Sequence, residues 1–160
     1  MRNRLASHAW LSLRTLQSCL AIILALLCIT SIPASAATAK DVSATWHGYW
    51  TSPEGFQYEA DMTLSVDDQN AVTGAIRWTL RKSPRPAEQA KIDMSGVEHV
   101  SGIYLPGSGA VKIEGTSVED PNHILGTDKY RLILSDDAKV LGGITWDHGP
   151  WTGQIYLHRQ

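Results

Sequence analysis

The sequence predicts an all-β fold, a small antiparallel up-and-down β-barrel of about eight strands that follows a cleaved signal peptide. Three observations lead to this prediction. The first 36 residues have the layout of a secretory leader, apolar residues alternate with polar ones from residue 45 onward, and glycines recur in the middle of the predicted strands. A β-sandwich built from the same strands is the alternative.

Residues 1–36 are expected to be a signal peptide. Two arginines near the start precede an apolar run from Cys19 to Ile32, and the small residues Ala34, Ser35 and Ala36 follow it. This order is typical of a cleavable leader. The run is about fourteen residues long, and a membrane-spanning helix needs roughly 20. We therefore expect cleavage after Ala36, no stable membrane anchor, and a secreted or periplasmic protein.

The 124 residues that remain have the size of a single domain. Residues 37–44 form a polar lead that we expect to be disordered, and residues 45–160 form the single barrel domain. Both cysteines lie in the leader, so the exported chain has no disulfide and no thiol chemistry. Its 16 acidic and 11 basic residues give a net charge of −5, which argues against nucleic acid or anionic membranes as partners.

Alternation of apolar and polar residues defines the strands, because a half-buried strand repeats every two residues. The alternation is clearest from Phe56 to Val66. The predicted strands are 45–51, 56–66, 72–80, 97–105, 110–116, 129–134, 140–146 and 151–158, with 91–94 as a possible further short strand. Most connections are rich in turn residues, and the two long ones are 81–96 and 117–128.

Glycine recurs in these strands with large apolar residues two positions before and after it. The pattern centres on Gly48, Gly74, Gly102, Gly142 and Gly153. Positions two apart share one face of a strand, so each glycine is expected to face the interior. A glycine within a strand marks a bend or a close approach of another segment. Its repetition favours a closed, strongly curved barrel in which the first strand pairs with the last.

Three short features resemble calycin-type barrels, the group that includes lipocalins and avidin-like proteins. Gly48-Tyr49-Trp50 on the first strand resembles the G-x-W motif, whose tryptophan closes the barrel floor. Thr127-Asp128, with Tyr130 displaced by one position, resembles the T-D-Y motif of lipocalins. Arg159 resembles the C-terminal basic residue that packs on the first-strand tryptophan. The resemblance implies the barrel architecture and no specific ligand, and the lack of a C-terminal helix and disulfide favours a shorter avidin-like or bacterial barrel.

Aromatic residues are the strongest indication of function. Trp146 and Trp151 bracket a tight turn at a strand end, where they are expected to rim an open barrel mouth. Trp78 and Tyr104 complete the predicted ligand-binding set. Since such rings pair an apolar face with a polar tip, the leading hypothesis is an exported binding protein for a small apolar, aromatic or glycan-like ligand. The alternative for these rings is that they fill the barrel.

A second hypothesis is an exported protein-interaction module, such as a hydrolase inhibitor. Arg81, Lys82 and Arg85 concentrate positive charge in one loop of an acidic domain, which predicts a docking patch for a protein partner. The structural alternative is a solvated connection stiffened by prolines.

An enzyme is the third and least favoured hypothesis, and no catalytic residue is predicted. A nucleophile elbow is absent, and an enzyme would need a polar cluster in the cavity, such as Glu98 or His99 facing another titratable group. No metal or other cofactor is expected, because the histidines show no metal-ligand spacing.

Overall fold

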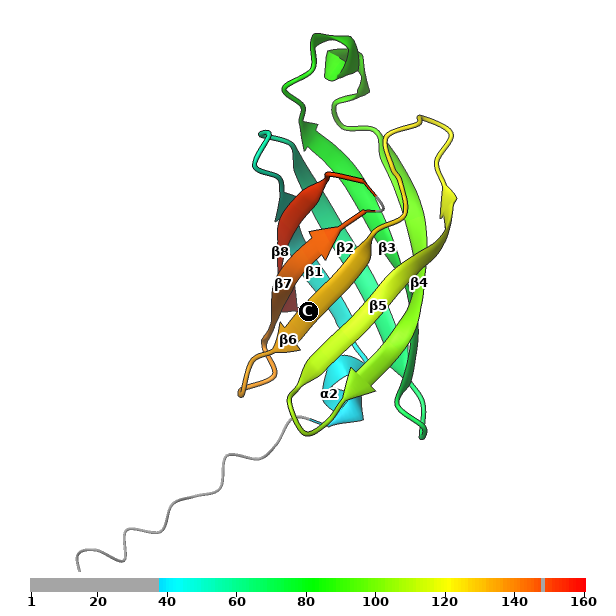
Figure 1. Ribbon diagram of the computed structural model, residues 1–160, viewed down its shortest axis with the longest axis vertical. Coiled ribbons are helices and arrows are strands. Elements are labelled where there is room, and N and C mark those ends of the chain that lie inside the picture. The colour runs from blue at the N-terminus through cyan, green and yellow to red at the C-terminus, as the bar shows by residue number, and fades with distance from the viewer. Residues whose placement is uncertain (1–37, 148) are drawn as a thin grey trace, which may run out of the picture. The chain divides into compact units, whose positions relative to one another are not determined.

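The computed structural model describes residues 38–147 and 149–160 (Figure 1). The predicted signal peptide and His148 lie outside the described residues. Eight antiparallel strands of the described chain form a closed barrel in chain order, which confirms the predicted up-and-down topology. The strands are β1 (Thr45–Thr51), β2 (Gln57–Val66), β3 (Ala71–Lys82), β4 (Ser95–Leu105), β5 (Ala110–Glu119), β6 (Lys129–Leu134), β7 (Val140–Trp146) and β8 (Thr152–Arg159). Within these residues no helix has the length and apolar character needed to cross a bilayer.

The barrel closes where the first strand meets the last, as the sequence predicts. β1 pairs antiparallel with β8, with Gly48 opposite Leu157 and Trp50 opposite Ile155. β6 and β7 have the predicted bounds residue for residue, whereas β5 runs three residues further, past a bulge against β4. The possible strand at 91–94 does not form, because the 3₁₀ helix η1 (Pro86–Lys91) and a turn occupy that part of the chain.

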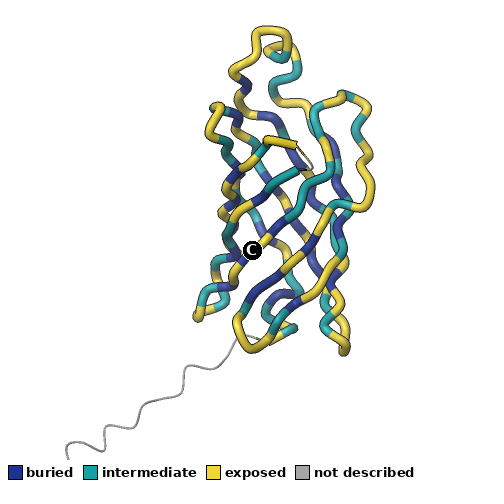
Figure 2. The backbone as a smooth tube through the Cα atoms, in the orientation of Figure 1, coloured by how far each residue is buried: buried dark blue, intermediate teal, exposed yellow. Residues whose placement is uncertain are grey.

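Side chains alternate between the barrel interior and its outer wall along each strand. On β2, Ala60, Met62 and Leu64 are buried and the residues between them are exposed. Figure 2 shows the same alternation of buried and exposed residues along the strands. The inward side chains form one hydrophobic core inside the closed sheet.

The lead expected to be disordered contains instead a one-turn helix, α2 (Ala39–Val42), at the lower end of the barrel in Figure 1. Its apolar residue explains the difference, because the side chain of Val42 is fully buried against the core. Ser43 adds a polar anchor, since its Oγ accepts a hydrogen bond from the Val66 N–H at 2.9 Å. The polar composition of residues 37–44 therefore led to a prediction of disorder for a segment that closes one end of the barrel.

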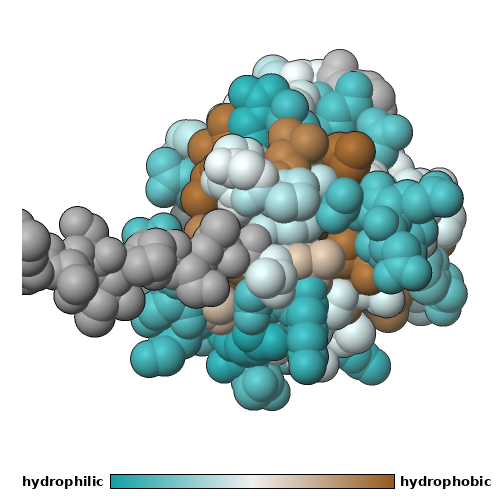
Figure 3. All heavy atoms as spheres, turned by 90° about the horizontal axis from the view of Figure 1, so that it is seen from below, coloured by the Kyte–Doolittle hydropathy of each residue, from teal (hydrophilic) through white to brown (hydrophobic). Residues whose placement is uncertain are grey.

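The tryptophan that closes this floor is Trp46, and not Trp50 of the G-x-W motif. Trp46 is fully buried, and its Nε1–H donates to the Val42 carbonyl at 3.2 Å. The Arg159 guanidinium lies 5.9 Å from the centre of the same ring. The expected contact of Arg159 with a first-strand tryptophan is thus present, but it is made with Trp46 and not with Trp50. Seen from below, this end is covered mostly by hydrophilic side chains with hydrophobic patches between them (Figure 3).

Close strand packing explains why glycine recurs on the interior face. A Cβ atom at Gly102 would lie 2.0 Å from the Lys112 carbonyl oxygen, and one at Gly48 would lie 2.0 Å from that of Tyr156. The predicted inward orientation is wrong at Gly142, because Leu141 and Thr145 are the buried residues of β7. Gly143 takes the inward position on that strand. The pattern therefore marks closely packed strands, but on β7 it was assigned to the wrong face.

A matched pair of substitutions tests this packing. Gly102→Ala should lower the free energy of unfolding by about 2–3 kcal/mol, because its new Cβ meets backbone that can move only with the neighbouring strand. Gly142→Ala, whose Cβ has its nearest neighbour at 3.3 Å, should change it by less than about 1 kcal/mol. Urea unfolding of both variants measures the difference, and equal losses would contradict the close-approach explanation.

Candidate functional site

The end of the barrel opposite α2 opens into a cavity of about 350 Å³. The loops that join β1 to β2, β3 to β4, β5 to β6 and β7 to β8 surround it. The aromatic side chains that line it are Trp50, Phe56, Tyr58, Trp78 and Trp151. Its charged lining residues are Arg85, Glu88, Glu98, Asp128 and Asp147. The cavity thus combines aromatic walls with an excess of carboxyl groups.

Edge-to-face contacts fix the rings of the wall. Tyr58 lies between Trp50 and Trp78, with ring centres 5.7 and 6.1 Å away. The polar tips are also held, since Trp50 Nε1–H donates to Thr145 Oγ1 at 2.7 Å and the Tyr58 hydroxyl donates to the Ile124 carbonyl at 2.8 Å. Contacts within the protein therefore hold the ring faces in place.

Glu98 is the only carboxylate of the described residues that is almost fully buried, with 2% of the residue exposed. Its Oε2 accepts hydrogen bonds from the Tyr130 hydroxyl and from Trp78 Nε1–H at 3.1 Å, and its Oε1 accepts from the Asp128 backbone N–H at 2.8 Å. Burial raises the pKa of Glu98 to about 7, although these three donors oppose the shift. Gly115 provides the space, because a Cβ there would lie 2.1 Å from Oε1.

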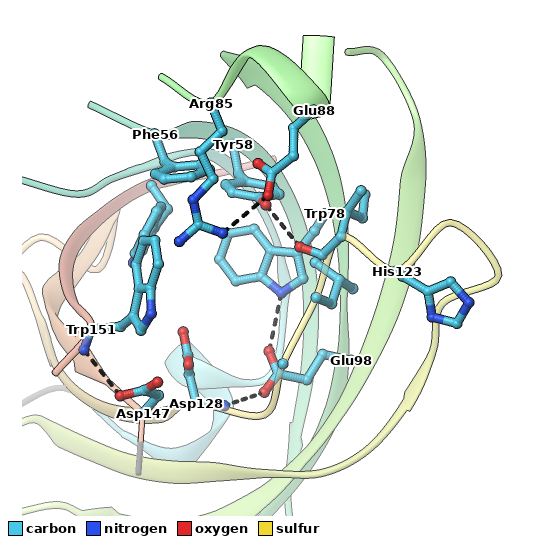
Figure 4. A pocket seen from close by; sticks show the side chains of 14 residues that line it. Phe56, Tyr58, Trp78, Arg85, Glu88, Glu98, His123, Asp128, Asp147 and Trp151 are labelled. Atoms are coloured by element: carbon cyan, nitrogen blue, oxygen red, sulfur yellow. Dashed lines mark hydrogen bonds and ion pairs between the residues drawn. The ribbon is translucent and has the colours of Figure 1, made fainter. Parts of the chain in front are cut away.

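Asp128 contributes a second carboxyl group, which points into the cavity (Figure 4). Within the described residues this carboxyl group forms neither a hydrogen bond nor an ion pair. Asp147 is differently placed, because its Oδ1 accepts the backbone N–H groups of Gly149 and Trp151 at 2.7 and 3.1 Å and fixes the β7–β8 turn. Burial, and then the charge of Asp147, raise the pKa of Asp128 to about 6.

Arg85 enters the cavity from the β3–β4 loop, as Figure 4 shows. Its guanidinium lies 4.9 Å from the Trp151 ring centre and 5.3 Å from that of Phe56. One of its nitrogens is 3.1 Å from a carboxylate oxygen of Glu88. The loop is braced by Ser83, whose hydroxyl donates to Glu88 at 2.7 Å. The positive charge predicted for the loop surface is therefore directed partly inward.

The structure brings together part of the predicted ligand-binding set. Trp78 and Trp151 line the cavity. Trp146 lies on the outer wall, where the Arg131 guanidinium is 5.7 Å from its ring centre, because the preceding residue, Thr145, is the one that faces inward. Tyr104 is buried at the opposite end, near the β2–β3 turn, where its N–H donates to the Asn70 carbonyl.

The three basic residues of the predicted docking patch do not share one surface. Arg81 lies on the outer wall and is paired with Glu59 at 2.7 Å and with Asp93. Lys82 is exposed at the end of β3, and Arg85 turns into the cavity. Most of this positive charge is therefore neutralised within the chain.

Sequence reasoning did not select Asp128, Phe56 or Tyr58 as site residues, and it named Glu98 only as a requirement for an enzyme. The burial of Glu98 could have been predicted from the sequence, because Glu98 and Val100 are two positions apart and share the inward face of β4. A carboxylate in that register must be buried, and a buried carboxylate needs donors around it.

One group of possible metal ligands also emerges within the described residues, on the outer wall. His47, Glu59 and Asp61 each place a ligand atom within 4.8 Å of the others. These groups already have partners, since His47 Nδ1 is 2.7 Å from Asp61 and Glu59 is bound to Arg81. The group lies on β1 and β2 and does not line the cavity.

Comparison of the chain with known protein families, with curated protein sequences and with solved structures found no match.

The raised pKa of Glu98 predicts a pH dependence of stability. The folded protein binds this proton more tightly than the unfolded chain, so the stability that Glu98 contributes is fully present below about pH 4.5 and is lost as the pH rises through about 7. Between pH 6 and 8 the loss should be about 1 kcal/mol. Urea unfolding should show that Glu98→Gln flattens this slope, while Glu114→Gln on the outer wall keeps it. Parallel slopes in all three proteins would contradict the assignment.

Proposed function

We propose that this protein binds a small organic ligand in the open mouth of its barrel, outside the cytoplasm, as a secreted or periplasmic protein. The observation that carries this proposal is the contrast between the two ends. Val42 and Trp46 are fully buried at the lower end, whereas the upper end has a cavity of about 350 Å³. A concave site with aromatic walls and a few placed polar groups is typical of small-molecule binding.

A relationship to calycin-type barrels belongs to the same proposal. Its support is the closed antiparallel barrel of eight strands and the Arg159 guanidinium on the ring of Trp46, a first-strand tryptophan. Asp128 and Tyr130, from the segment that resembles the second lipocalin motif, both contact Glu98. These features support the architecture and leave the ligand to be derived from the cavity.

The second candidate function, an interaction module, is favoured by the outer wall and not by the basic loop. Tyr49, Tyr156, Gly142 and Ile133 lie opposite one another across β1, β8, β7 and β6. Tyr49 and Ile133 are each more than half exposed. An exposed apolar row of this kind is a feature of protein-binding surfaces.

An enzymatic role has less support than binding. Glu98 and Tyr130 do form a pair of titratable groups within hydrogen-bond reach, as an enzyme would require. Both carboxylate oxygens of Glu98 already accept hydrogen bonds from the protein, and the residue is almost fully buried. This arrangement suits a fixed polar group beneath a ligand better than direct proton exchange with a substrate.

Two tryptophans at neighbouring strand ends provide the test of ligand binding. Titration with 2-phenylethanol and with phenyl β-glucoside, small aromatic and glycan-like probes, should change the intrinsic fluorescence of the purified protein. Trp151→Ala should weaken the binding of whichever probe responds by about 1–3 kcal/mol, the scale of a lost buried aromatic contact. Trp146→Ala should leave it unchanged, because that ring lies outside the cavity.

Equal effects of the two substitutions would contradict binding in the mouth. If neither probe binds and Tyr156→Lys abolishes association with a protein partner, the interaction surface on the outer wall is the function instead.

A further inference from the structure

The charge of the cavity restricts the kind of ligand it can hold. Its lining contains four carboxyl groups and a single arginine among the described residues, and the Glu88 carboxylate is bound to that arginine. The side chain of His123 points away from the cavity (Figure 4). A neutral or anionic ligand would leave the ionised forms of Asp128 and Glu98 without a counter-charge in a partly desolvated site, which is unfavourable.

Arg85 shows where a positive group fits. Its guanidinium occupies the space in front of the Trp151 and Phe56 rings, which are themselves packed edge to face with centres 5.1 Å apart. Aromatic faces attract cations, more strongly where water is excluded. The Arg85 side chain is 55% exposed, so more than half of its surface already meets solvent and only the remainder is uncovered when it leaves this place.

We infer that the cavity selects organic cations, amines or quaternary ammonium compounds with an aromatic or apolar body, and that the ligand's positive group replaces the Arg85 guanidinium in front of Trp151 and Phe56. The inference rests on the proposed function and adds the ligand class. The body of the ligand lies against the Trp78 and Tyr58 rings, and the carboxyl group of Asp128 faces its charge.

Such a ligand links binding to pH. The groups that face the two carboxyls are Tyr130 and Trp78 at Glu98, and Asp147 at Asp128, with Arg85 and Glu88 across the cavity. A bound cation favours the ionised carboxyls, so affinity rises with pH and protons are released on binding. A positively charged His123 at the rim would also repel the cation, which would change the affinity with pH in the same direction as the two carboxyl groups do. The His123→Gln variant removes this contribution and leaves that of the carboxyl groups.

The test compares three probes of similar size by isothermal titration calorimetry. They are benzyltrimethylammonium, which is positive at every pH, neutral 2-phenylethanol, and the anion phenylacetate. At pH 7.5 we expect benzyltrimethylammonium to bind at least tenfold more tightly than the other two. Its affinity should fall at least fivefold at pH 5.5, in the wild type and in His123→Gln alike.

Variants locate the effect. Asp128→Asn should weaken the binding of benzyltrimethylammonium at least tenfold and should reduce the pH dependence of that binding. Asp136→Asn, which changes an exposed residue at the lower end of the barrel, should do neither. Arg85→Gln should strengthen the binding of benzyltrimethylammonium, because the guanidinium that competes for the same place is removed.

Three outcomes would overturn the inference. Equal or tighter binding of 2-phenylethanol, weakened by Trp151→Ala, would contradict cation selection and leave small-ligand binding intact. Tightest binding of phenylacetate, abolished by Arg85→Gln, would show an anion site. Binding of none of the three would contradict the proposed function together with the ligand class.

Discussion

The carboxyl group of Glu98 is the constraint on which the upper half of this barrel depends. A carboxylate so deeply buried must be surrounded by donors, and the fold supplies them from β3, β6 and the β5–β6 loop as Trp78, Tyr130 and the N–H of Asp128. Gly115 leaves the room it occupies. Because these partners converge on one polar group, the interior beside it does not pack as a purely apolar core.

The two ends of the barrel differ for this reason. At the floor, Val42 and Trp46 are apolar and fully buried, and Arg159 covers the tryptophan from outside. At the mouth, carboxyl groups stand among aromatic rings, and a chain cation, Arg85, partly neutralises them. The guanidinium of Arg85 in front of the Trp151 and Phe56 rings is thus the observation that supports the proposed preference for organic cations.

Most of the fold could be predicted from short-range patterns in the sequence. The alternation of apolar and polar residues predicts the strands, and the repeated glycines within them predict a strongly curved sheet. The errors come from registers that alternation alone does not fix. On β7 the alternation was assigned one residue out of phase. Gly142 and Trp146 were therefore predicted to face the interior, whereas Gly143 and Thr145 lie on that face. Trp151 was predicted because it borders a turn at a strand end, and it lines the cavity together with Trp78. Glu98 was overlooked as a site residue because its donors are distant in sequence.

We propose that the ionisation of the Glu98 carboxyl group is coupled to the occupancy of the proposed ligand site. Carbon-detected NMR of the protein with ¹³C-labelled glutamate side chains tests it most directly. We expect one glutamate carboxyl carbon, missing from the spectrum of Glu98→Gln, to titrate at a pH of about 7 in the free protein, and at lower pH when the cavity is saturated with benzyltrimethylammonium. Titration of every glutamate in the ordinary acidic range, unchanged by that cation, would contradict it.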